Sequence, residues 1–208
     1  ANYPLEKSVE MHNLAMAKIV EKFESVGELN EALHHFDDVL SLYTRQAHPW
    51  RWFSASENKA EVLEDLSLRK NDGSRTREAI SIYRDQQTLI QRQYDQAHWA
   101  RIERNIGEAL YRLAFLTKDP AKLVEAETAF SNVVETIPKS APSDREKILR
   151  KLADTKCHRG KMTYDMSAIE DGVSLYNSLI DAGTATPRGT KNYFLLQSIE
   201  KCRDIKTK

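Results

Sequence analysis

The chain has 208 residues with 31 basic and 31 acidic side chains, so its formal net charge is zero. A neutral balance argues against a dedicated nucleic-acid binder, which usually carries a basic excess. No window approaches the roughly 18 apolar residues of a membrane span. Few glycines and prolines, set among many Ala, Leu, Glu, Lys and Arg residues, favour helix. We therefore expect an all-α protein.

Apolar residues recur at helical spacing along the chain, and no segment shows the strict alternation of a strand. The spacing predicts nine helices, at residues 5–26, 29–45, 50–70, 75–94, 97–117, 120–137, 144–163, 167–181 and 190–205. Gly27 is expected to end the first of these helices. Asp119 is a suitable N-cap before Pro120, which fits a first helical position.

Two serine–glutamate pairs have the spacing of a capping box, in which side chains satisfy the first backbone N–H groups of a helix. Ser143 with Glu146 precedes the seventh helix, and Ser167 with Glu170 precedes the eighth. We expect both helices to begin at these pairs.

A small residue followed four positions later by an aromatic one recurs every 46 or 47 residues. The pairs are Ala32 with Phe36, Ala79 with Tyr83, Ala126 with Phe130, and Gly172 with Tyr176. The preceding helices carry small residues at the same period, namely Ala60, Gly107 and Ala153. A fixed period of this length indicates a helical solenoid, because one helix pair cannot bury its apolar face alone. The competing interpretation is an irregular helical bundle.

We accordingly expect one domain, residues 1–208, built as an α-α superhelix of four antiparallel helix pairs and a C-terminal capping helix. The repeats are expected at about residues 5–45, 50–94, 97–137 and 144–181, with the capping helix at 190–205.

From Asn105 to Phe130 the pattern resembles the tetratricopeptide repeat (TPR), with a small residue at Gly107 and the Ala126–Phe130 pair. The period of 46–47 residues exceeds the family's roughly 34, so each helix is expected to be nearly two turns longer. The chain is similar to long-helix variants found in multidomain bacterial proteins. This resemblance implies a scaffold that binds a peptide or protein segment on a concave surface, without catalysis or a cofactor.

The resemblance also implies that the first helix of each pair lines the binding groove. The side chains expected there are Arg101, Arg104, Asn105, Glu108, Arg112, Lys147, Arg150 and Asn58. Arginine pairs well with carboxylates, and asparagine can bind an extended peptide backbone. The hypothesis is that this groove binds an acidic segment or a C-terminal carboxylate. The competing interpretation is that these charges are solvated or pair with each other at i,i+4.

Other candidate sites are weaker. His34 and Asp38 lie four apart on one helix face, but a zinc site normally needs three or four ligands, so no metal site is predicted. No phosphate loop, nucleophile elbow or zinc-protease motif occurs, so we predict no catalytic residues and no enzyme activity. Trp52 and Trp99 are in repeat register and are expected in the core, whereas Trp50 is expected to be more exposed.

Cys157 and Cys202 have no motif spacing, so we expect no disulfide framework, with Cys157 facing the groove or packed as a thiol. A reducing, cytoplasmic location follows, although a chain that starts at Ala1 rather than Met leaves export open. The expected partner is a protein or peptide, not nucleic acid or membrane. The alternative function is a structural or self-assembly module, or a fragment of a longer array.

Overall fold

The computed structural model describes residues 25–138, 141–182 and 190–204, which divide into two compact units. Unit 1 extends to Leu89 and unit 2 begins at Ile90. Every regular element within the described residues is a helix. The predicted helix at residues 5–26, and with it the first half of the first repeat, lies outside the described residues except for its last two positions.

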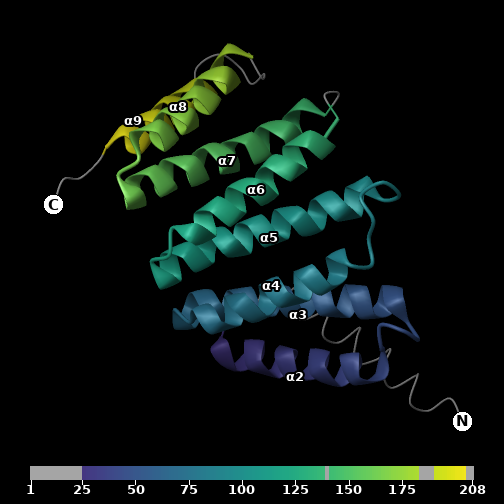
Figure 1. The fold of residues 1–208 in the computed structure, drawn as a ribbon. Helices are drawn as coiled ribbons and strands as arrows, with labels where there is room; N and C mark the ends of the chain where they lie inside the picture. The colour runs from purple at the N-terminus through teal and green to yellow at the C-terminus, as the bar shows by residue number, and fades with distance from the viewer. Residues whose placement is uncertain (1–24, 139–140, 183–189, 205–208) are drawn as a thin grey trace, which may run out of the picture. The chain divides into compact units, whose positions relative to one another are not determined.

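Unit 1 contains α2 (Val26–Leu42), α3 (Pro49–Lys70) and α4 (Gly73–Gln87), with α3 packed on both of the others (Figure 1). The Ser25 side chain accepts a hydrogen bond from the Glu28 N–H and thereby caps α2. Gly27 therefore lies in the first turn of α2, and the prediction that it ends a helix is wrong. The predicted fourth helix was too long, since α4 ends at Gln87 and the Thr88 hydroxyl turns back to bond the Asp85 carbonyl at 2.6 Å.

Unit 2 contains α5 (Gln96–Thr117), α6 (Ala121–Thr136), α7 (Pro142–Thr163), α8 (Met166–Asp181) and α9 (Thr190–Arg203). The helices stack in sequence order, with α7 between α6 and α8 and with α9 against α8 (Figure 1). Tight turns join α5 to α6 and α7 to α8, so each of these pairs is an antiparallel hairpin. Helix α3 packs against α4, α5 against α6 and α7 against α8, in the ranges where the sequence predicts helix pairs at 50–94, 97–137 and 144–181.

The recurring small and aromatic residues lie in the core, as the sequence predicts. All four small residues and all four aromatic residues of these pairs are buried. A Cβ atom added to Gly107 would lie 2.8 Å from the Phe130 ring, and one added to Gly172 would lie 2.8 Å from the Ala153 carbonyl oxygen. Absence of a side chain at these positions is what allows the two helices of a hairpin to approach so closely.

The turns inside the three hairpins share one capping arrangement, which the sequence analysis did not predict. Each first helix ends at a residue in the left-handed conformation, with φ between 52° and 58°, and the next residue is always aspartate. The pairs are Asn71–Asp72, Lys118–Asp119 and Tyr164–Asp165. Each aspartate side chain accepts a backbone N–H from the start of the second helix. One dipeptide therefore ends one helix and caps the next.

Both predicted capping boxes are wrong. Helix α7 already begins at Pro142, whose missing N–H suits the first turn, and its N-cap Ala141 makes no side-chain hydrogen bond. Helix α8 begins at Met166, because the Asp165 side chain caps it by accepting from the Ala168 N–H at 3.2 Å. Asp119 does bond the Ala121 N–H at 3.0 Å, although Pro120, rather than Asp119, occupies the N-cap position of α6.

Replacing Lys118 with glycine is expected to stabilise the protein by about 0.5–1 kcal/mol, because glycine has no Cβ atom to clash in the left-handed conformation. The measurement is the free energy of unfolding in urea. Lys122→Gly, inside α6, is the matched control and should lose a similar amount through poor helix propensity. A destabilising Lys118→Gly change would contradict the assigned turn geometry.

The two cysteines form a disulfide between α7 and α9, so the predictions of no disulfide and of a groove-facing Cys157 are wrong. The Cα atoms of Cys157 and Cys202 are 5.2 Å apart, which is an ordinary disulfide separation. Both residues are buried in one apolar cluster that includes Ile169, Val173 and Tyr176. The pairing depends on α9 folding back over α7 and α8, and 45 residues of sequence separation give no sign of it.

Candidate functional site

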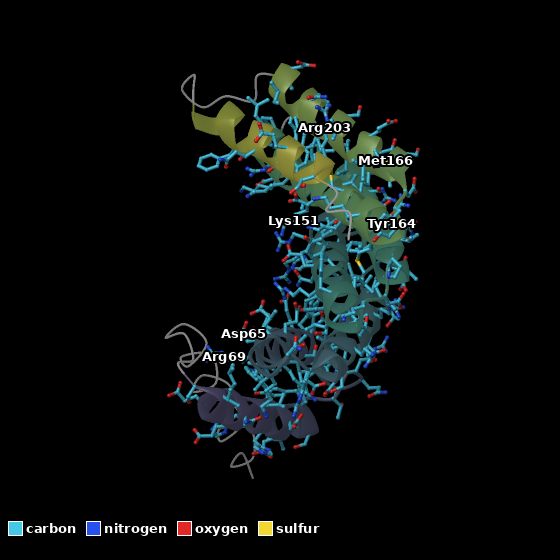
Figure 2. All side chains as sticks on the ribbon, turned by 90° about the vertical axis from the view of Figure 1, so that its left-hand side faces the viewer. Asp65, Arg69, Lys151, Tyr164, Met166 and Arg203 are labelled. Carbon is cyan, nitrogen blue, oxygen red and sulfur yellow. A yellow bond between two sulfur atoms is a disulfide. The ribbon has the colours of Figure 1, made fainter. Side chains whose placement is uncertain are left out.

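The candidate site lies in unit 2, where side chains of α5 and α7 meet. An open pocket of about 220 Å³ is lined by Glu108, Tyr111, Arg112, Phe130, Lys151, Asp154 and Thr155. All but Phe130 come from α5 or α7, the first helices of their hairpins. Figure 2 shows Lys151 on one side of unit 2 and Tyr164, at the turn between α7 and α8, on the other. The first helices therefore supply the pocket, as the sequence analysis expected of the groove.

Glu108 is the centre of a charged cluster on this surface. Its carboxylate oxygens lie 3.1 Å from the Lys151 Nζ, 3.9 Å from an Arg112 guanidinium nitrogen and 4.0 Å from the Arg104 Nε. All four side chains are partly exposed, so each pair contributes little to stability, typically below about 1 kcal/mol. The cluster carries three positive charges against one negative charge, and the Asp154 carboxylate lining the same pocket brings the count to three against two, a remaining excess that favours an anionic group from outside.

Burial changes the proton affinity of two groups in the pocket. Burial lowers the pKa of Arg112 from its usual value, because the charged form loses hydration. Burial, with a smaller contribution from the Asp154 carboxylate, raises the pKa of Tyr111 to about 12. The Tyr111 hydroxyl therefore stays protonated at neutral pH and can serve as a hydrogen-bond donor.

An aromatic wall adjoins the charged cluster. The rings of Tyr111, Phe115 and His158 meet edge to face, with centroids 5.0 to 5.6 Å apart. The His158 Nδ1 lies 2.7 Å from the Asp154 carbonyl oxygen and 3.1 Å from the Tyr111 hydroxyl. A carbonyl can only accept, so Nδ1 carries the ring proton. Phe115 is 43% exposed, so this wall offers apolar surface beside the cations.

Asp154 is held in place from behind the pocket. The Tyr176 hydroxyl of α8 donates a hydrogen bond to its carboxylate. Burial, followed by this hydrogen bond, raises the pKa of Tyr176. Tyr176 is also one of the aromatic repeat residues, so core packing of the last hairpin positions one wall of the pocket.

The predicted binding residues are only partly brought together. Glu108 and Arg112 line the pocket, and Arg104 joins it through Glu108. The others lie elsewhere: Arg101 and Asn105 are half-buried on α5, Arg150 is half-buried on α7, Lys147 is exposed and pairs with Asp144, and Asn58 is buried in unit 1. Their role in binding stays a prediction.

Several pocket residues were not among the predicted binding residues. The residues outside that set are Tyr111, Phe130, Lys151, Asp154 and Thr155. Lys151 lies two residues before the small residue Ala153, the position that Asn58 and Asn105 hold before Ala60 and Gly107. A search for charged residues at that position would have found it.

Two of the three tryptophans are less buried than expected. Trp50 is 63% exposed, which confirms the prediction that it is more exposed than Trp52 and Trp99. Trp52 and Trp99 are only half-buried, and each is covered by an arginine guanidinium from the preceding loop, at 5.9 Å for Arg45 and 4.9 Å for Arg92. These arginines are also 47 residues apart, so the stacking is a repeated structural contact.

Within the described residues, no three or more His, Cys, Asp or Glu side chains gather in a way that could hold a metal ion. Asp37, beside the predicted pair of possible ligands, forms an ion pair with Lys59 at 2.9 Å. In the same part of the chain, no helix is both long enough and apolar enough to cross a membrane.

Three successive helix hairpins, with their buried small and aromatic residues at a period of 46–47, define a TPR-like helical repeat protein. The fold is similar to that of a crystal structure of a Podosopora anserina putative kinesin light chain with nearly identical TPR-like repeats. The TM-score is 0.61 at 13% sequence identity, covering 94% of this chain and 85% of that one. No family model and no curated protein matches the sequence.

Proposed function

We propose that the chain is a non-catalytic scaffold that binds a carboxylate-bearing peptide or protein segment against the α5–α7 surface of unit 2. The observation that carries this proposal is the cluster in which Arg104, Arg112 and Lys151 surround Glu108 at the edge of the pocket. A carboxylate from a partner gains charge-assisted hydrogen bonds there, which are about twice as strong as neutral ones.

The neighbouring groups suit an extended segment. Arg101 and Asn105 lie on α5, and Lys147 and Arg150 lie on α7, so positive charge continues along both helices beyond the pocket. The aromatic wall at Tyr111 and Phe115 provides apolar contact for a side chain next to the bound carboxylate. We assign Asn58 no part in this site, because it belongs to unit 1; its binding role is a separate prediction.

The direct test is binding of a fluorescein-labelled octapeptide of alternating glutamate and glycine with a free C-terminal carboxylate. Removing one cluster cation and one cation further along α7, in Arg104→Ala with Arg150→Ala, is expected to weaken binding about tenfold or more, because each lost charge-assisted contact costs about 1.5–3 kcal/mol. Fluorescence anisotropy measures the dissociation constant. Binding should also weaken as salt increases.

The matched control is Lys118→Ala with Lys122→Ala, which removes the same charge from the far end of the α5–α6 hairpin. Its affinity should stay within about twofold of the original chain. A pull-down with the intact chain against Arg101→Glu with Arg104→Glu extends the test to natural partners. An unchanged affinity for the Arg104→Ala, Arg150→Ala variant would refute the groove assignment.

The alternative, a self-assembly module, is favoured by one observation. Phe194 and Leu196 of α9 are 58% and 52% exposed on the last described helix of unit 2. A concentration-independent monomer in sedimentation velocity would exclude this alternative. The Cys157–Cys202 disulfide favours an oxidising compartment over the cytoplasm predicted from the sequence, because disulfides form and persist most readily there.

A further inference from the structure

The contact between α9 and the rest of unit 2 is thin. Among the described side chains of α9, only Leu195, Ile199 and Cys202 are buried. Two of its larger apolar residues, Phe194 and Leu196, point into solvent instead. A helix of 14 residues is marginal by itself, so this helix depends on its attachment to α7 and α8.

The disulfide supplies a covalent attachment at the far end of that helix. Cys202 is the second-last residue of α9, and its partner Cys157 lies in the middle of α7. A Cβ atom added to Gly172 of α8 would lie 2.6 Å from the Cys157 sulfur. Both cysteines are buried, so the bond is enclosed between three helices. We expect a reductant to reach it when the last turn of α9 frays.

The surface under α9 is apolar. Ala153 of α7 and Ile169, Val173, Tyr176 and Leu179 of α8 pack with the buried residues of α9 in one cluster. When α9 leaves, these side chains meet water, and the α7–α8 hairpin loses the cover of this apolar face. Tyr176, which positions Asp154, belongs to the same cluster.

We propose that docking of α9 is controlled by the redox state of Cys157 and Cys202, so that the disulfide latches the C-terminal helix and its reduction releases that helix. This inference does not rest on the peptide-binding proposal. Latching requires an external disulfide, such as glutathione disulfide or the disulfide of an oxidoreductase, as the oxidant.

The exchange is balanced. One cysteine thiolate attacks a sulfur of the external disulfide, forms a mixed disulfide and releases one thiol. The second cysteine thiolate then attacks the protein sulfur of the mixed disulfide, forms the Cys157–Cys202 bond and releases the second thiol. Two protein thiols are oxidised and one external disulfide is reduced. An external dithiol, itself oxidised to a disulfide, reverses both steps.

The test is hydrogen–deuterium exchange of the full chain, oxidised and then reduced with dithiothreitol in native buffer, with the thiol state followed by mass. Amides of α9 are expected to exchange at least tenfold faster after reduction, while those of α5 and α6 keep their protection. Cys202→Ser should show fast α9 exchange with or without dithiothreitol. Cys202→Ala, which avoids a buried hydroxyl, serves as the second variant.

Two results would overturn the proposal. The first is equal exchange of α9 in the oxidised and reduced chains, which would mean that packing alone holds the helix. The second is a disulfide that dithiothreitol reduces only when α5 and α6 also lose protection, which would make it a staple of the whole unit instead of a latch.

Discussion

Ala126→Arg is expected to lower the free energy of unfolding of unit 2 by about 4 kcal/mol or more, which is close to the whole stability of many domains. Ala126 has no exposed surface and lies on the face of α6 that packs within the hairpin. An arginine there must either bury its charge or push the helices apart, and both are costly. Urea unfolding followed by circular dichroism measures the change.

Lys122→Arg is the matched control on the same helix. Lys122 is about one-third exposed and pairs with Glu125, and arginine keeps its charge and length. Its effect should stay within about 0.5 kcal/mol. Equal losses for the two variants would mean that α6 does not present the Ala126 face to the core, and the repeat assignment would fail with it.

Phe130→Ala carries the second largest expected effect, a loss of about 3–5 kcal/mol. The Phe130 ring is 2% exposed and fills the space left by the missing side chain of Gly107. Truncation leaves a cavity on the wall of the candidate pocket. Phe130→Leu should cost less than about 1.5 kcal/mol, because it keeps most of the apolar volume. The free energy of unfolding again provides the measurement.

A double-mutant cycle tests whether Gly107 and Phe130 are complementary. Gly107→Ala places a Cβ atom 2.8 Å from the ring, so alone it should destabilise the hairpin even though alanine is the better helix former. In the Phe130→Leu background the same change should cost less, with a coupling energy of about 0.5–3 kcal/mol. Strict additivity would show that the two residues do not share this space.

Repeated residues have structural roles in this protein, whereas the candidate binding site consists largely of residues that do not recur. The small and aromatic pairs, the aspartate after each left-handed cap and the arginine over tryptophan all recur at the period of the hairpins. Recurrence fits a structural role, since every hairpin meets the same packing problem. Lys151 and the Tyr111–Phe115–His158 wall occur once among the described hairpins, and a binding site needs such local differences.

The sequence by itself determined the helical repeat. Phe130 packs against Gly107 within one hairpin, and the small and aromatic residues recur at fixed spacing, so this constraint can be read along the chain. Helix ends were less predictable. Ser143 and Pro142 each carry a signal for the start of α7, and the local sequence does not show that the helix begins at Pro142.

Only the tertiary structure decided which side chains of different helices meet. Glu108 and Lys151 are 43 residues apart, yet they form an ion pair because α5 and α7 both pack against α6. Cys157 and Cys202 pair because α9 folds back over α7 and α8. Such contacts follow from how hairpins stack, and stacking depends on the shapes of whole helix faces, which no short spacing in the sequence records.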